Sequence, residues 1–207
     1  MSTETLDREA IMGYLTSILE VQEKISEYIH KRLCVNCDEL VDEAWLNKRK
    51  EAFKGIRGLV DKYAFSKRLP RDELGILTQS IISHLLNIQH TFLRVLVLID
   101  ILQDESFNEI FMDSMSTISS KVNEMLTALK KMVIQRAEYL DEAEETLEVL
   151  IKLEREIDED NIVICRQISV ATGSDCDFAS YIMRKIVAEL EHISDYVKEC
   201  AEIVAEI

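Results

Sequence analysis

The 207-residue chain is 47% hydrophobic and long enough to bury a core as one domain or as two small ones. Its formal net charge of −15 argues against nucleic acid and anionic lipid as partners, because most of the surface would repel phosphate groups and no dense basic patch is expected to offset this. Only five glycines and one proline interrupt a sequence rich in Leu, Ile, Glu, Lys and Ala, which disfavours a sheet protein and predicts an all-α fold.

Apolar residues recur at helical spacing in the first half of the chain and predict three long helices. They are expected over about residues 5–33, 43–65 and 71–102, the third opening after Pro70 with a typical helix-start sequence. The third helix is apolar on nearly every side and is therefore expected to be central. The apolar positions of the first two helices are Ile11, Leu15, Ile18, Ile25 and Ile29, then Phe53, Ile56, Val60 and Tyr63.

The second half predicts three more helices, over about residues 107–137, 140–168 and 177–206. Thr172-Gly173-Ser174-Asp175 is the clearest loop, and Asp175 is the candidate N-cap of the last helix. The apolar positions are Ile110, Met115, Ile118, Val122, Met125, Leu129 and Val133, then Leu147, Leu150, Leu153, Ile157 and Ile164.

The order long, medium, long occurs twice, which indicates an internal duplication. Residues 1–103 and 104–207 would each form a three-helix bundle with antiparallel neighbours, and the two tandem bundles would make one compact domain. The register is set by aligning Val60-Asp61 with Ile157-Asp158 and Ile88 with Ile193.

The chain shows no signal-peptide pattern, which predicts a cytoplasmic protein. The longest apolar run, residues 92–102, is too short to span a bilayer. Five cysteines, an odd number, favour reduced thiols over a disulfide framework. Cys34 and Cys37 form a lone CxxC, which is weak evidence for a zinc site.

Four carboxylates carry the main functional hypothesis. Glu154 and Asp158 are four residues apart on one predicted helix, and Glu191 and Asp195 are four apart on the next, beside the apolar stripe of Val187, Leu190, Ile193 and Val197. If these helices pack together, the four groups would surround one volume that needs a cation, either a Lys or Arg side chain or a metal ion. Iron, manganese, magnesium, calcium or zinc would suit such ligands.

The same spacing also arises by chance in so acidic a chain. Glu156 and Asp160 are a further pair of this kind. The candidate carboxylates could simply form a solvated rim, with Arg155, Arg184 and Lys198 supplying surface ion pairs. Two Glu-x-x-His motifs, at Glu27/His30 and Glu189/His192, raise the alternative of a ferritin-like or di-metal carboxylate protein. Glu189 and His192 are expected on the far side from Glu191, so chance explains these motifs better.

The sequence has no Gly-rich phosphate loop, no Ser nucleophile elbow and no recognisable Cys/His pair. It therefore predicts a protein that is not an enzyme, with no catalytic residue.

Residues 187–204, VAELEHISDYVKECAEIV, resemble the terminal helix of PhoU-like proteins, whose pattern Leu-Glu-x-Ile-x-Asp is matched by Leu190, Glu191, Ile193 and Asp195. Residues 152–168 resemble the preceding helix of that family, and residues 69–81 the opening of the corresponding helix in the first repeat. With length, duplication and helix order, the resemblance covers nearly the whole chain. It is greatest to the branch of phosphate transport regulators often encoded beside phosphate permeases.

The resemblance implies two tandem three-helix bundles, carboxylates that hold metal, and a regulatory role in phosphate uptake without catalysis. The implied partner is a phosphate transporter or its signalling partner, which would place the protein at the inner face of the membrane without insertion. A homodimer is compatible with the apolar third helix. The ligands carried over are Glu154, Asp158, Glu191 and Asp195.

The first repeat departs from the family pattern. Under the alignment above, Arg57 and Asp61 stand where Glu154 and Asp158 stand in the second repeat, and Leu86 and His90 replace Glu191 and Asp195. Since neither a guanidinium nor Leu ligates metal, a site is expected in the second repeat alone.

Overall fold

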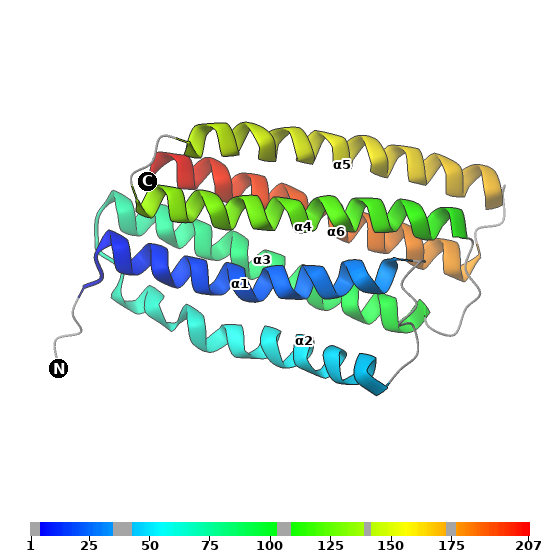
Figure 1. The fold of residues 1–207 in the computed structure, drawn as a ribbon, viewed down its shortest axis with the longest axis horizontal. Coiled ribbons are helices and arrows are strands. Elements are labelled where there is room, and N and C mark those ends of the chain that lie inside the picture. The colour runs from blue at the N-terminus through cyan, green and yellow to red at the C-terminus, as the bar shows by residue number, and fades with distance from the viewer. Residues whose placement is uncertain (1–4, 35–42, 103–108, 139–141, 173–176) are drawn as a thin grey trace.

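The computed structural model describes residues 5–34, 43–102, 109–138, 142–172 and 177–207, and these residues form helices and no strand (Figure 1). The all-α prediction is confirmed for this part of the chain. The elements are α1 (Arg8–Leu33), α2 (Glu43–Lys62), the 3₁₀ helix η1 (Tyr63–Arg68), α3 (Glu73–Leu102), α4 (Glu109–Ala137), α5 (Ala143–Thr172) and α6 (Phe178–Glu206).

The helices lie alongside one another in layers, and each layer packs on the next. The helix α5 packs on α4 and α6, while α4 in turn packs on α1 and α6 on α3. The helix α2 packs mainly on α1. As a result α5 and α2 lie at opposite edges of the molecule, with the other four helices between them (Figure 1).

Aspartate side chains fix where the first and last helices begin. The carboxylate of Asp7 accepts a hydrogen bond from the Ala10 backbone N–H at 2.9 Å, and that of Asp177 accepts one from the Ser180 N–H at 2.7 Å. This hydrogen bond lowers the pKa of Asp177. The prediction that Asp175 caps α6 is wrong, because an N-cap directly precedes the first helical residue, which is Phe178.

The start of α3 depends on a glycine. The helix begins at Glu73, two residues later than expected, after Asp72 accepts a hydrogen bond from the Gly75 N–H at 3.1 Å. A Cβ at Gly75 would lie only 1.9 Å from the carbonyl oxygen of Pro70. The chain can fold back over this first turn only because residue 75 has no side chain.

The predicted apolar faces are buried along α1 and along α4 where the side chains are described. On α2 the prediction fails at Val60, which is 64% exposed, whereas the preceding Leu59 is fully buried. One residue turns a helix by 100°, so the two side chains point to different surroundings. Ile157 is fully buried whereas Val60 is exposed, so the alignment of Val60-Asp61 with Ile157-Asp158 is not supported. The alignment of Ile88 with Ile193 pairs two fully buried residues.

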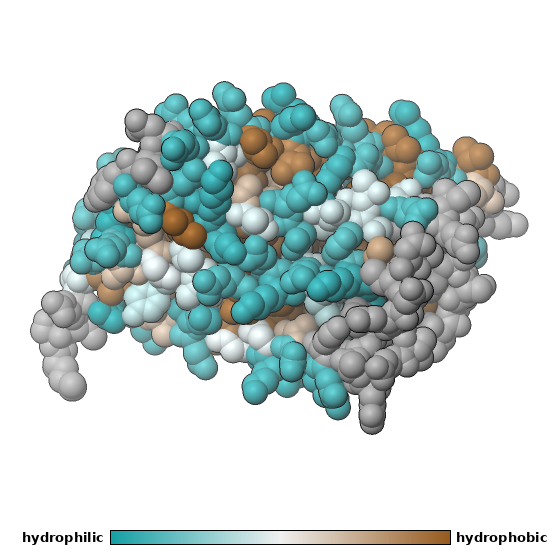
Figure 2. All heavy atoms as spheres, in the orientation of Figure 1, coloured by the Kyte–Doolittle hydropathy of each residue, from teal (hydrophilic) through white to brown (hydrophobic). Residues whose placement is uncertain are grey.

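The helix α3 is longer than the apolar run that the sequence singled out. Among the described residues it is the one helix long and apolar enough to cross a membrane by length and composition, and half of its most apolar stretch is buried. It packs on α6, α1 and α2, as the core helix of a globular protein does. The face of the molecule in Figure 2 is covered mostly by hydrophilic side chains.

Two buried glutamines tie the first three helices together. Gln22 on α1 donates from Nε2 to the Leu85 carbonyl of α3 at 2.8 Å, and Gln89 on α3 donates to the Ile56 carbonyl of α2 at 2.9 Å. Both side chains are almost fully buried, so these bonds fix the relative position of the helices as well as contributing about 1 kcal/mol each.

Replacing Gly75 by alanine should destabilise the protein by about 1–3 kcal/mol, because the new Cβ would overlap the Pro70 carbonyl and the first turn of α3 would have to shift. Gly58→Ala is the matched control, since a Cβ there meets no atom within 4 Å. The control should stabilise the protein by about 0.5–1 kcal/mol through helix propensity. Urea denaturation measures both, and effects of the same sign would contradict the close approach at Gly75.

Candidate metal centre

The contact between α5 and α6 brings the four predicted carboxylates into one neighbourhood. Glu154 and Asp158 lie on the face of α5 that packs toward α6, and Glu191 and Asp195 lie on the facing side of α6. Glu154 is 6% exposed, and the other three side chains are partly buried. Fully buried apolar residues of both helices, including Ile157 and Ile193, lie beside them.

The pKa values show that these carboxylates act on one another across the helix contact. Burial raises the pKa of Asp195 above its usual range, and the charges of Asp158 and Glu154 on the other helix raise it further. Burial makes the largest contribution to raising the pKa of Glu191. The charge of Asp195 raises this pKa further, and those of Asp158 and Glu154 do so to a smaller extent. The pKa of Asp158 is raised by burial and by Glu154.

One lysine partly neutralises the cluster. Lys198, one turn after Asp195 on α6, donates from Nζ to Glu154 Oε1 at 2.5 Å, and this bond raises the pKa of the lysine. Among the described residues no Lys or Arg side chain forms an ion pair with Asp158, Glu191 or Asp195. Of the four carboxylates, Lys198 therefore pairs with Glu154 alone, while the charge of His192 lowers the pKa of Glu191 and of Asp195.

His192 is a further candidate ligand that the sequence placed wrongly. Its Nδ1 lies 3.3 Å from Glu191 Oε2, so it is not on the far side from that residue. One ligand atom each from Glu191, His192 and Asp195 lie within 4.8 Å of one another. Adjacent residues on a helix point 100° apart, but the length of both side chains lets them converge.

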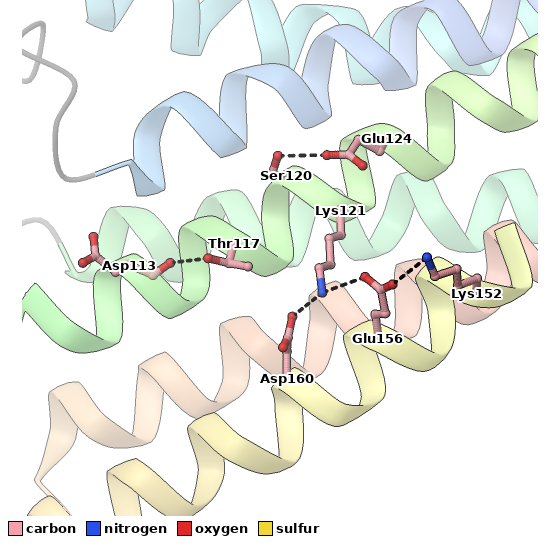
Figure 3. Close-up of polar contacts among 8 residues, drawn as sticks. All are labelled: Asp113, Thr117, Ser120, Lys121, Glu124, Lys152, Glu156 and Asp160. Carbon is pink, nitrogen blue, oxygen red and sulfur yellow. Dashed lines mark hydrogen bonds and ion pairs between the residues drawn. The ribbon is translucent and has the colours of Figure 1, made fainter. Parts of the chain in front are cut away.

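The second carboxylate pair on α5 has a different environment (Figure 3). Lys121 of α4 lies with Nζ 2.8 Å from Asp160 Oδ2 and 3.1 Å from Glu156 Oε2, and Lys152 lies 3.6 Å from Glu156. The hydrogen bond and charge of Lys121 lower the pKa of Glu156. Glu156 and Asp160 are therefore ordinary ion-pairing residues. Glu154 and Asp158 have the same four-residue spacing, but they lie on the neighbouring face of α5, toward α6.

The residues of the two Glu-x-x-His motifs, which raised the ferritin-like alternative, contact separate partners. Glu27 pairs with Lys31 at 2.6 Å, and His30 Nδ1 lies 3.1 Å from Ser119 Oγ on α4. Glu189 accepts from Arg94 Nε of α3 at 2.8 Å. The two motifs do not share a site in the structure.

The positions aligned with the ligands in the first repeat do not form such a cluster. Leu86 is partly buried and His90 exposed, and Arg57 and Asp61 are both exposed on α2. Cys37 lies outside the described residues, so the zinc hypothesis for Cys34 and Cys37 stays a prediction.

Oxygen donors predominate at the α5–α6 contact, with one imidazole beside them. Carboxylates suit magnesium, manganese and iron, and a mixed oxygen and nitrogen set also accepts zinc. The ligand atoms that converge within 4.8 Å among the described residues are those of Glu191, His192 and Asp195, and their chemistry suits a divalent or trivalent ion. The four-carboxylate set of Glu154, Asp158, Glu191 and Asp195 stays a prediction. A scan of family models and searches of curated proteins and solved structures found no match to this chain.

The raised pKa values predict how stability depends on pH. A carboxyl whose pKa is raised in the folded chain favours folding while it is protonated, and this contribution is lost as pH rises through the raised pKa. In the presence of chelator, Asp195→Asn should therefore gain stability relative to wild type as pH rises from about 4 to about 8.

Glu156→Gln is the control of opposite sign. Because the pKa of Glu156 is lowered in the folded protein, its ionised form favours folding, and the variant should lose stability relative to wild type over the same pH range. Urea titrations at several pH values measure both differences. A difference between wild type and Asp195→Asn that does not change with pH would contradict the coupling between the carboxylates.

Proposed function

We propose that this chain is a non-enzymatic, cytoplasmic regulator of the PhoU-like kind, which contacts a phosphate transporter or its signalling partner and holds a metal ion between α5 and α6. The observation that carries the proposal is the electrostatic coupling of Glu154, Asp158, Glu191 and Asp195 across the contact of α5 with α6, where Lys198 pairs with Glu154. These four residues are also the ones that the sequence resemblance carries over as ligands.

The packing of the helices supports the two-repeat architecture that belongs to this proposal. With repeats at residues 1–103 and 104–207, the first helices of both repeats, α1 and α4, pack together, and so do the third helices, α3 and α6. The middle helices, α2 and α5, lie at opposite edges (Figure 1). Two tandem three-helix bundles related by a pseudo-twofold axis would produce this pairing.

The residues of the centre suggest how metal could act as a regulatory input. A bound ion would supply positive charge that offsets the repulsion among the carboxylates of α5 and α6. Glu154 is already paired with Lys198, so it can serve as a full ligand only if this ion pair opens. Metal occupancy would thereby change the contacts along α5 and α6, which a partner protein could detect.

Protein purified without chelator should contain a stoichiometric metal ion, and Mn²⁺ added to chelator-treated protein should stabilise it. At a free concentration about 100 times Kd, the free energy of unfolding should rise by about 2.7 kcal/mol. Elemental analysis and thermal melts measure both effects.

Glu191→Gln/Asp195→Asn should lose the bound metal and the stabilisation, whereas the control Glu156→Gln/Asp160→Asn should keep them. Lys198→Met should bind metal more tightly than wild type, because Glu154 is then free. Metal-free protein whose melting temperature does not respond to added ions would contradict the site, as would equal losses in both double variants.

Deletion of the gene should change phosphate uptake by the host cell, and the wild-type gene should restore it. Uptake of labelled phosphate at high and low external phosphate is the measurement. The Glu191→Gln/Asp195→Asn variant should restore uptake regulation incompletely if the metal is the regulatory input. Uptake that is unchanged by deletion at every phosphate level would rule out the regulatory role, whatever the outcome of the metal analysis.

A further inference from the structure

Cationic residues are concentrated in one part of this acidic chain. Residues 49–71 contain eight of the 24 Lys and Arg residues but only two of the 39 Asp and Glu residues. This segment forms most of α2, all of η1 and the turn before α3. The net charge of −15 averages over a surface on which the two signs are unevenly distributed.

Five of these cations form what we call the cationic edge, namely Lys50, Lys54, Arg57, Lys67 and Arg71. All five side chains are exposed, and among the described residues none of them forms an ion pair. The first three recur at steps of four and three, which places them in a row on α2 opposite the buried Ile56 and Leu59. Among the side chains of α2 that the structure describes, Asp61 is the carboxylate on the same face, one turn after Arg57.

The opposite edge of the molecule carries about half of the excess negative charge. Residues 142–160 at the start of α5 contain nine Asp and Glu residues and two Lys and Arg residues. The helices α4 and α1 lie between α5 and α2 (Figure 1). The two edges are therefore separated by three interhelical distances of about 8–10 Å each. The charge distribution therefore gives the molecule a positive edge at α2 and a negative edge at α5.

This separation exceeds the range of electrostatic interactions in salt solution. The Debye length is about 8–10 Å at ionic strengths near 0.1–0.15 M, so a surface in contact with α2 is screened from most of the charge on α5. The cations in contact with that surface are not screened to the same extent. The overall acidity, which argued against anionic lipid, therefore does not decide what the α2 edge binds.

The form of the cationic edge favours a flat anionic surface over a protein partner. Protein interfaces usually have an apolar or aromatic centre that becomes fully buried. On the outer side of α2 the exposed large apolar residue is Val60 alone among the described residues. The apolar groove of about 390 Å³ beside α2 faces α1 instead, where Val21, Ile25 and Ala52 line it.

We propose that the cationic edge adsorbs the protein to the anionic face of a lipid membrane, with the α5 edge turned away from the lipid. Each Lys or Arg close to an anionic leaflet strengthens adsorption about fivefold, so a row of several is sufficient for reversible adsorption. Hydrophilic side chains project from the coloured part of this lower edge in Figure 2, so the protein would adsorb without inserting. The proposal does not depend on the metal centre.

The test is co-sedimentation of the full chain with vesicles of phosphatidylcholine alone and with vesicles that contain about one part phosphatidylglycerol to two parts phosphatidylcholine. Wild-type protein should bind the anionic vesicles at low ionic strength and dissociate from them as the salt concentration increases. It should not bind the neutral vesicles. Lys50→Glu/Lys54→Glu/Arg57→Glu should weaken binding by about a hundredfold.

The control is Lys131→Glu/Arg166→Glu/Lys185→Glu, which changes the net charge equally at exposed positions on α4, α5 and α6. It should bind within about threefold of wild type, because these positions lie away from the cationic edge. Circular dichroism and thermal melts of both triple variants establish that they are folded.

Three outcomes would overturn the proposal. They are absence of wild-type binding to anionic vesicles at low salt, equal losses in the two triple variants, and equal binding to neutral vesicles. Polyglutamate is the probe for the alternative occupant. If it binds in a manner that depends on Lys50, Lys54 and Arg57 while vesicles do not bind, the cationic edge docks an acidic protein segment and the lipid proposal is wrong.

Discussion

Glu154, Asp158, Glu191 and Asp195 repel one another across the contact of α5 with α6, and apolar residues beside them hold the two helices together. Ile157 and Ile193 are fully buried. Burial of each such side chain favours folding by about 1.5–3 kcal/mol. That burial offsets the repulsion among carboxylates that Lys198 and His192 balance only in part. A sequence that places unbalanced charge in its own helix interface is expected at a functional site more than in a purely structural contact.

What each carboxylate of α5 does depends on the neighbouring helix. Toward α4, Lys121 neutralises Glu156 and Asp160, and the result is an ordinary link between two helices (Figure 3). Toward α6, more carboxylates face Glu154 and Asp158. The same charge asymmetry extends over the whole molecule, since α5 forms the acidic edge and α2 the cationic one. A metal-responsive contact at one side and a membrane-facing edge at the other would suit a regulator that works beside a transporter.

Much of this structure could be predicted from the sequence because helical periodicity determines which residues share a face. The buried positions of α1 and α4 followed from it, and so did the convergence of Glu154 and Asp158 with the α6 carboxylates, since the apolar residues beside them orient each helix. Val60 was misplaced because an error of one residue turns a side chain by 100°, and periodicity did not separate it from Leu59.

Other features depend on tertiary contacts that periodicity does not contain. The pairing of Lys198 with Glu154 requires the relative height of two helices, and the contact of His192 with Glu191 requires side-chain conformations. The cap at Asp177 could not be separated from one at Asp175 because the loop offers both. The cationic edge was missed in the sequence because the net charge of the whole chain conceals it, whereas a count of charges over residues 49–71 reveals it.

The most direct test of the central claim is anomalous diffraction from crystals of the protein grown with Mn²⁺. We predict an anomalous peak within about 2.0–2.6 Å of carboxylate oxygens from both helices, drawn from Glu154, Asp158, Glu191 and Asp195, with Lys198 displaced from Glu154. A structure in which these carboxylates carry no peak, or in which Lys198 keeps its ion pair while the only peak lies at Glu156 and Asp160, would contradict the claim.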